Sequence, residues 1–287
     1  MAPLIVITGP TASGKSGLAL ELAERYHGEI ICADSRTVYA GMDVGTAKPS
    51  GADRARVPHH LLDVVAPNER FTAGQFQRLA LQAIADIRAR GRVPFLVGGT
   101  GLYIDSVVLN YTFDGTPADD QEREVLESKT ADELHMLLKK HHIDIPQNRG
   151  NKRHLIRAWE QRGINTSRQP EPNDQTYVVA ITTNSMTLEH RIRDRAHEMF
   201  AAGVLDEARV LGEKYGWESE AMTGNIYPIL HEVLDGLMTE PQAIERFVIR
   251  DRQLAKRQIT WLKRHDYVRW LSIDEAQKYL SSLLDQS

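Results

Sequence analysis

The sequence contains one cysteine, Cys32, among 287 residues. A single cysteine excludes a disulfide within the chain and any zinc site built from several cysteines. Nowhere do apolar residues run uninterrupted for the roughly 18 positions that a membrane-spanning helix needs. The first residues, "MAPLIVITG", follow a strand pattern and carry neither the charged segment nor the cleavage site of a signal peptide. These absences predict a folded cytoplasmic protein without a membrane segment.

A strong net charge is also missing, since the formal value is −4. This average argues weakly against a nucleic-acid partner, but residues 148–168 and 246–264 are locally basic. A solvated helix face is the ordinary reading of such runs, whereas their one-sidedness favours a surface for a polyanion. The basic residues are Arg149, Lys152, Arg153, Arg157, Arg162 and Arg168 in the first stretch and Arg246, Arg250, Arg252, Lys256, Arg257, Lys263 and Arg264 in the second.

Short apolar runs alternate with helical patterns through the first half of the chain. Strands are predicted at 4–9, 28–34 and 93–99, and helices at 15–26 and 76–91. This alternation predicts an α/β fold with a parallel sheet covered by helices.

A mainly helical insertion is predicted within this core. The chain becomes polar and helical from residue 114 to about 168, and a strand at 176–182 then returns to the same sheet. After Met186 only helices are predicted, with breaks near Gly216 and Gly224. The predicted division is 1–113 for the first part of the core, 114–170 for the insertion, and 171–287 for the return strand and C-terminal helices.

The segment "GPTASGKS" fits the P-loop pattern G-x-x-x-x-G-K-[ST], with a predicted strand before it and a helix after it. Its glycines let backbone N–H groups surround phosphate oxygens at the positive end of the helix. Lys15 supplies charge to a phosphate, and the Ser16 hydroxyl is placed to bind Mg²⁺. We therefore predict a phosphate-binding P-loop, as in ATP-binding proteins, made of Gly9, Pro10, Thr11, Ala12, Ser13, Gly14, Lys15 and Ser16.

Two further stretches end predicted strands, where ligands bind in open α/β sheets. Asp34 and Ser35 follow the second strand, and a carboxylate there can bind Mg²⁺, act as a general base or merely cap the next helix. In "GGTGLY", Thr100 lies among three glycines, which either let a substrate approach the backbone or serve a turn with positive φ. The alternative readings of each stretch stay open at this level.

The stretches "DVGTAKPS" and "VPHHLLDV" lie between the second strand and its helix. Lys48 could reach a phosphate, and His60 or Asp63 could orient neighbouring groups. No nearby third ligand accompanies His59 and His60, so a structural role is favoured over a metal site.

Taken together, these stretches resemble one family, the tRNA dimethylallyltransferases of bacterial type, also called tRNA isopentenyl transferases. The resemblance runs in order along nearly the whole chain and is carried by "GPTASGKS", "ADS", "GMDVGTAKPS", "VPHHLLD", "GGTGLY", "RHLIRAWE", "LEHRIRDRAHEMFAAGVLDEA" and "RQLAKRQITWLKR". It implies transfer of a dimethylallyl group from dimethylallyl diphosphate to N6 of adenosine 37, beside the anticodon of tRNA. Diphosphate would then be the leaving group, its charge stabilised by the P-loop and Mg²⁺.

The resemblance also implies roles for single residues. Asp34 matches the family's general base, and Thr100 matches a threonine beside it. Contacts to the anticodon stem-loop are implied for Asp34, Ser35, Arg36, Thr37, Thr100, Arg123, Arg153, His154, Leu155, Ile156 and Arg157. A monomer is expected, because no uncovered apolar heptad or strand edge is evident.

Several positions depart from the family pattern, among them Trp159 in "AWE", where the family has "ALE". Thr37 stands where the family usually has glutamine, His154 replaces the second arginine of a pair, and Pro228 replaces a basic residue. These departures affect residues expected to recognise adenine and tRNA, whereas the residues expected to bind diphosphate match the family pattern.

Other functions stay open from the residues alone. A small-molecule kinase would use the P-loop and Asp34 but not the basic stretches. An adenylate isopentenyltransferase would modify free AMP, ADP or ATP, and a nucleotide-switched RNA-binding module would leave Asp34 and the hydroxyls idle. The long basic, helical half of the chain favours transfer to tRNA.

Overall fold

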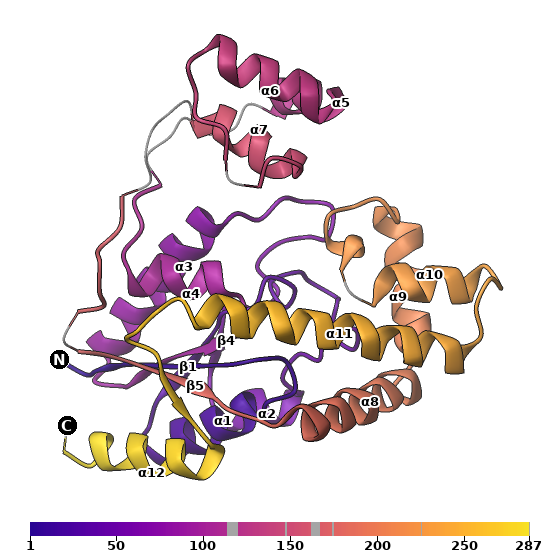
Figure 1. Cartoon of the computed structure of the whole chain (residues 1–287). Coiled ribbons are helices and arrows are strands. Elements are labelled where there is room, and N and C mark those ends of the chain that lie inside the picture. The colour runs from indigo at the N-terminus through magenta and orange to yellow at the C-terminus, as the bar shows by residue number, and fades with distance from the viewer. Residues whose placement is uncertain (114–119, 147, 162–166, 174, 225, 287) are drawn as a thin grey trace. The chain divides into compact units, whose positions relative to one another are not determined.

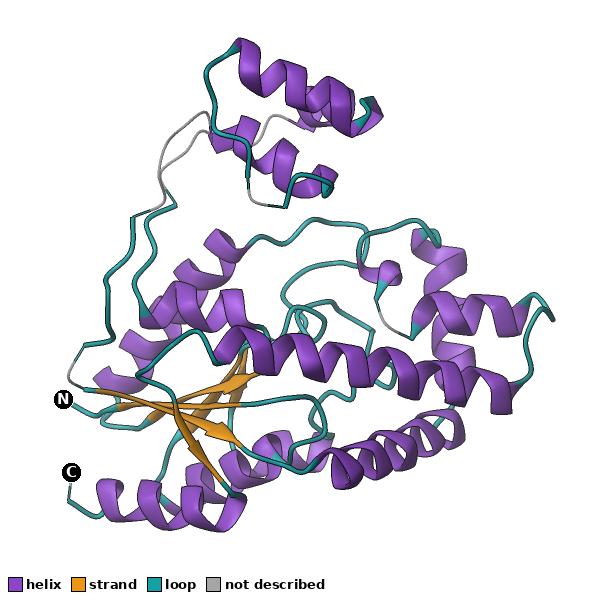
Figure 2. Ribbon diagram, viewed as in Figure 1, coloured by secondary structure: helices purple, strands orange, loops and turns teal. Residues whose placement is uncertain are grey.

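The computed structural model describes residues 1–113, 120–146, 148–161, 167–173, 175–224 and 226–286. Within these residues, parallel strands form one sheet in the order β3-β2-β4-β1-β5-β6 (Figure 2). The strands are β1 (Leu4–Thr8), β2 (Glu29–Cys32), β3 (His59–His60), β4 (Pro94–Gly98), β5 (Thr176–Ile181) and β6 (Arg269–Leu271). The predicted parallel α/β fold is confirmed, and so is the return of the chain to the same sheet in β5.

Helices cover both faces of the sheet. The helices of the part that contains it are α1 (Lys15–Arg25), α2 (Gly51–Arg56), α3 (Ala73–Ala89), α4 (Gly101–Val108), α8 (Ser185–Ala201), α9 (Val204–Tyr215), the 3₁₀ turn η1 (Ala221–Thr223), α10 (Tyr227–Leu234), α11 (Glu240–Leu262) and α12 (Ile273–Leu284). Figure 1 shows α1 and α12 along one face and α3 and α4 along the other. Strands β1, β2 and β4 are buried along their whole length, as strands covered on both sides must be.

Local sequence sets where several helices begin. Thr72 precedes α3, and its hydroxyl accepts a hydrogen bond from the backbone N–H of Gln75 while the Gln75 side chain binds back to Thr72. Ser272 and Glu275 form the same reciprocal pair at the start of α12. Such a capping box satisfies N–H groups that the first helical turn leaves without partners.

The expectation of helices alone after Met186 is wrong, because β6 lies in that region. Its three residues pair with β5 at the sheet edge, and Ala180 lies opposite Trp270. A three-residue edge strand offers too short an alternation of apolar and polar residues to stand out between helical patterns. The two-residue strand β3 is missed for the same reason.

Residues 110–170 form a second compact unit, apart from the unit of residues 1–109 and 171–287 that contains the sheet. Its helices are α5 (Asp120–Ser128), α6 (Ala131–Lys140) and α7 (Lys152–Gln161). They pack around the buried side chains of Leu126, Leu134, Leu138, Leu155 and Ile156. The predicted boundary between residues 113 and 114 adjoins residues 114–119, which lie outside the described residues. Among the helices that the structure describes, none combines the length and apolarity needed to span a membrane.

Candidate active site

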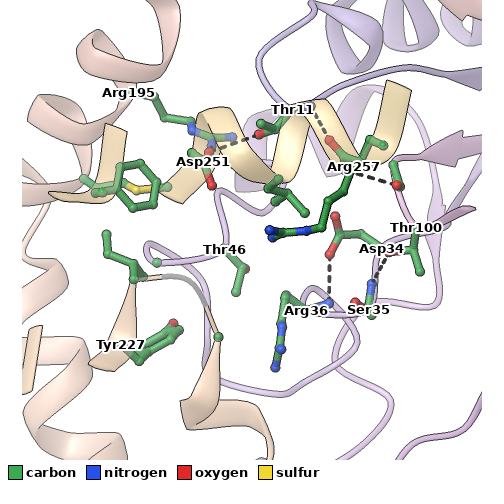
Figure 3. A pocket seen from close by; sticks show the side chains of 18 of the residues that line it. Thr11, Asp34, Ser35, Arg36, Thr46, Thr100, Arg195, Tyr227, Asp251 and Arg257 are labelled. Atoms are coloured by element: carbon green, nitrogen blue, oxygen red, sulfur yellow. Dashed lines mark hydrogen bonds and ion pairs between the residues drawn. The ribbon is translucent and has the colours of Figure 1, made fainter. Parts of the chain in front are cut away.

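A cavity of about 380 Å³ lies where the loops after β1, β2 and β4 emerge from the sheet (Figure 3). These strands run parallel, so their carboxyl ends share one edge, the usual ligand position in such sheets. Thr11, Asp34, Ser35, Arg36 and Thr100 line the cavity, so the structure brings these predicted site residues together. Its apolar lining includes Met199, Ile226, Phe247, Leu254 and Trp261.

The loop from Gly9 to Ser16 connects β1 to α1 and contains glycines with positive φ at both Gly9 and Gly14. Gly14 has a φ of 91° immediately before α1, a conformation that only glycine adopts readily. The hydroxyl of Ser13 is buried and has no hydrogen-bond partner. A buried donor without a partner costs free energy, and an anion in the loop would supply the missing acceptor.

Lys15 and Arg195 add positive charge beside this loop. The Lys15 ammonium donates a hydrogen bond to the carbonyl of Pro10 over 3.1 Å. Burial lowers the pKa of Lys15 to about 8, although the carboxylate of Asp34 opposes the shift. The Arg195 guanidinium pairs with Asp251, while its Nε is buried without a hydrogen-bond partner. Both cations would interact favourably with an anion bound in the loop.

Ser16 ends the loop at the protein surface. It is the second residue of α1 and is exposed, and neither it nor Lys15 lines the cavity described above. Within the described part of the chain, no three His, Cys, Asp or Glu side chains gather as a metal cluster. The assignment of Mg²⁺ to the Ser16 hydroxyl stays a prediction.

Asp34 and Thr100 follow the ends of β2 and β4, and both line the cavity. One carboxylate oxygen of Asp34 accepts a hydrogen bond from the backbone N–H of Arg36 at 2.8 Å. The Thr100 hydroxyl accepts one from the N–H of Ser35 at 3.0 Å. Asp34 thus caps a turn rather than a helix, and Thr37 is buried behind it, outside the cavity lining.

The structure rules out one sequence reading of "GGTGLY", the turn with positive φ, while the approach of a substrate to this backbone stays a prediction, since Gly99 and Gly101 line the cavity. A Cβ on Gly98 would lie 2.0 Å from the carbonyl oxygen of Ala33, and one on Gly99 would lie 2.3 Å from Nε2 of Gln258. Gly101 meets the Trp261 ring at 2.3 Å in the same way. None of the three has positive φ. Atoms of the protein itself therefore occupy the space that a Cβ would need at these three positions.

Helices α8 and α11 contribute groups to which the sequence analysis assigned no role. Gln258 accepts a hydrogen bond from the Thr11 N–H at 2.8 Å and donates one to the Gly99 carbonyl at 3.0 Å. Asp251 accepts a hydrogen bond from the Thr11 hydroxyl at 3.3 Å and one from Arg195. The available signal was the position of Asp251, one turn after the buried Phe247 on the apolar face of α11. Because aspartate is rarely buried, an aspartate on the apolar face of a basic helix indicates a functional site more often than an average residue does.

Lys48 and His60 have structural partners. The Lys48 ammonium is buried and binds the Tyr39 carbonyl and the carboxylates of Asp43 and Asp63. His60 pairs with the buried Glu29 at 2.6 Å. The structural role favoured for the two histidines fits the contact of His60, whereas a contact of Lys48 with phosphate stays a prediction.

The remaining predicted tRNA contacts lie in the unit of residues 110–170. Arg153, His154 and Arg157 are exposed on α7, whereas Leu155 and Ile156 belong to the core of the unit. Arg123 forms ion pairs with Glu127 and Glu160 and so joins α5 to α7. Arg157 also pairs with Glu160, at 3.4 Å, while half of its side chain stays exposed. Arg162, from the first basic stretch, lies outside the described residues.

Known proteins resemble this chain along nearly its whole length. The model of the IPP transferase family matches residues 37–265. A tRNA dimethylallyltransferase from Desulforudis audaxviator is 42% identical over 95% of this chain and 93% of its own length, and one from Roseiflexus sp. is 40% identical over 96% and 94%. The crystal structure of a tRNA isopentenylpyrophosphate transferase from Bacillus halodurans has a TM-score of 0.74 and 34% identity, covering 100% of this chain and 98% of its own. A eukaryotic dimethylallyltransferase acting on tRNA has a TM-score of 0.80 and 25% identity, covering 95% and 74%.

Proposed function

This chain belongs to the IPP transferase family, and we propose that it transfers a dimethylallyl group from dimethylallyl diphosphate to N6 of adenosine 37 in tRNA. The observation that carries the proposal is the cavity itself. Its lining combines Thr11 of the P-loop and the Arg195 guanidinium with the carboxylate of Asp34 and the hydroxyl of Thr100 at the ends of β2 and β4, and Lys15 interacts electrostatically with Asp34 from outside the lining. One end suits a diphosphate, and the other suits an amine that must lose a proton.

At the diphosphate end, we assign binding to the loop of residues 9–16 with Lys15 and Arg195. The buried Ser13 hydroxyl and the Nε of Arg195 would each gain an acceptor. Their positive charge and hydrogen bonds favour the departing diphosphate more than the intact donor, because the diphosphate gains a further negative charge as the C1–O bond breaks, and this lowers the barrier to its release. Mg²⁺ bound through the Ser16 hydroxyl and phosphate oxygens would neutralise further charge there.

At the acceptor end, Asp34 is the proposed general base. The new bond joins N6 of adenine to C1 of the dimethylallyl group, and the C1–O bond breaks with its electron pair going to diphosphate. The proton lost from N6 goes to the carboxylate of Asp34. The N–H of Arg36 orients this carboxylate, and the N–H of Ser35 orients the Thr100 hydroxyl beside it. A carboxylate held in place in this way avoids reorganisation during the reaction.

The RNA partner is proposed to be the anticodon stem-loop, whose unpaired target base leaves its stack at low cost. The exposed Arg153, His154 and Arg157 would contact its phosphates. We further propose that the protein acts as a monomer in the cytoplasm, where its tRNA substrate is found.

Transfer of label tests this function. The chain is incubated with labelled dimethylallyl diphosphate and Mg²⁺ in the presence of tRNA, AMP and ATP together. We expect label at adenosine 37 of tRNA. Label in AMP or ATP would instead identify an adenylate isopentenyltransferase, and no transfer from this donor would contradict both assignments.

Substitution of Asp34 tests the mechanism. Asp34→Asn keeps the size of the side chain but removes the base, so kcat should fall by about 100-fold or more while both substrates still bind. Asp86→Asn, an exposed change on α3, is the matched control and should leave kcat unchanged. If Asp34→Asn weakens donor binding and spares kcat, the residue is not the base.

A further inference from the structure

The carboxylate of Glu207, on α9, is bound by three consecutive backbone N–H groups of another segment. Its Oε2 accepts hydrogen bonds from the N–H groups of Asp43 and Val44 at 2.8 and 2.7 Å, and its Oε1 accepts one from Gly45 at 2.8 Å. Oε1 also accepts the hydroxyl of Tyr227 at 2.8 Å. Successive N–H groups that converge in this way form an anion-binding concavity. In this protein the bound anion is its own side chain.

The segment held by Glu207 is part of the wall of the candidate active site. Gly45 and Thr46 line the cavity, and so does Tyr227 (Figure 3). The segment also packs tightly on that tyrosine, because a Cβ on Gly45 would lie 2.6 Å from the Tyr227 hydroxyl oxygen. One carboxylate therefore connects two separate parts of the wall.

Glu207 itself does not line the cavity. Any effect on the reaction must then pass through the segment it holds. Without the carboxylate, three N–H groups would have to find water, and the segment would sample other conformations. If only a fraction of molecules holds the wall in place, the apparent affinity for a ligand of the cavity falls by that fraction.

We propose that Glu207 is a positioning residue that preforms the wall of the cavity at residues 43–46 and Tyr227 for the dimethylallyl donor. The proposal rests on the function proposed above. The donor's hydrocarbon chain needs apolar surface beside the P-loop, and the held wall adjoins the apolar lining at Ile226 and Met199. A wall that is already in place removes the cost of ordering it when the donor binds.

A purely structural role is the competing explanation, since Glu207 lies in the first turn of α9, where any carboxylate favours the helix. Asp206 provides a matched control. It occupies the same turn, carries the same charge and is exposed, but its carboxylate pairs with Arg209 at 2.8 Å. Asp206→Asn removes the helix-end charge and leaves the contacts with residues 43–45 intact.

The experiment compares wild type, Glu207→Gln and Asp206→Asn by two measurements. Hydrogen exchange of the amides of residues 43–45 reads the contact directly and does not depend on any reaction. Steady-state kinetics with tRNA and dimethylallyl diphosphate then give KM for the donor and kcat. We expect Glu207→Gln to lose exchange protection at these amides and to raise the donor KM about tenfold, with kcat within about threefold of wild type. Asp206→Asn should match wild type in both.

Three results would overturn the proposal: unchanged protection in Glu207→Gln, lost protection with an unchanged donor KM, or equal losses in Asp206→Asn. If Glu207→Gln does not fold, Tyr227→Phe removes the single hydroxyl contact and should raise the donor KM in the same direction by a smaller factor. An unchanged donor KM in Tyr227→Phe would then count against the proposal. A wild-type protein that transfers nothing would contradict the proposed function, while the exchange measurement would still test the contact with Glu207.

Discussion

Gln258→Ala tests whether α11 sets the geometry of the P-loop. Gln258 accepts a hydrogen bond from the Thr11 N–H and donates one to the Gly99 carbonyl. The change leaves both backbone groups without their partner beside the cavity, where water can replace part of each bond. A net loss of about 1 kcal/mol for each bond gives about 2 kcal/mol in total. That total corresponds to a factor of about 30 in an equilibrium constant.

The loop is also held by β1 and α1, so the factor of about 30 is an upper bound on the rise in KM for dimethylallyl diphosphate. We expect a rise of about tenfold in steady-state assays with a smaller change in kcat, because Gln258 shapes the binding loop without accepting the proton. Gln253→Ala, an exposed change on the same helix, controls for helix propensity and should leave KM unchanged. An unchanged donor KM in Gln258→Ala, combined with a lower melting temperature, would refute the reasoning.

Three further predictions follow from charges in the structure. Since the pKa of Lys15 is lowered to about 8, its side chain loses its charge as pH rises from 7 to 9. The Kd of dimethylallyl diphosphate, measured by calorimetry, should therefore rise about tenfold over that range in wild type. The same Kd should not change with pH in Lys15→Ala. Burial raises the pKa of Glu29, but hydrogen bonds from Arg90 and His60 outweigh burial and lower it to about 2. The ionised Glu29 therefore stabilises the fold above about pH 4.3, and this contribution is lost as pH falls toward 2. The free energy of unfolding should fall by about 2 kcal/mol over this range, after allowance for the half-exposed partners. Urea titrations of Glu29→Gln should not show this pH-dependent fall. The double change Arg153→Ala, Arg157→Ala should lower the slope of log affinity for tRNA against log salt concentration by roughly 1.4 to 1.8, measured by filter binding. An unchanged slope together with a lower melting temperature would show that these arginines stabilise the fold instead.

Local sequence determined the parts of the protein that depend on nearby residues. The apolar runs at 4–9, 28–34, 93–99 and 176–182 predicted the four longest strands, because a strand buried on both faces is apolar along nearly all of its length. The turn between β1 and α1 could be predicted as well, since Gly14 is needed at a φ of 91° whatever the rest of the chain does. Ordered motifs along the chain then indicated the family that the comparisons identify.

The tertiary structure decided which distant residues meet. Thr11 binds Asp251 and Gln258, more than 200 positions further along the chain, and nothing in the P-loop pattern names these partners. The burial of Leu155 and Ile156 likewise depends on where α5 and α6 pack against α7. Periodicity along a sequence records which face of an element is apolar, but it does not record which other element covers that face. The partners of the P-loop, the glycine contacts with Gln258 and Trp261, and the hold of Glu207 on residues 43–45 all depend on that choice, which is made only when the elements pack together.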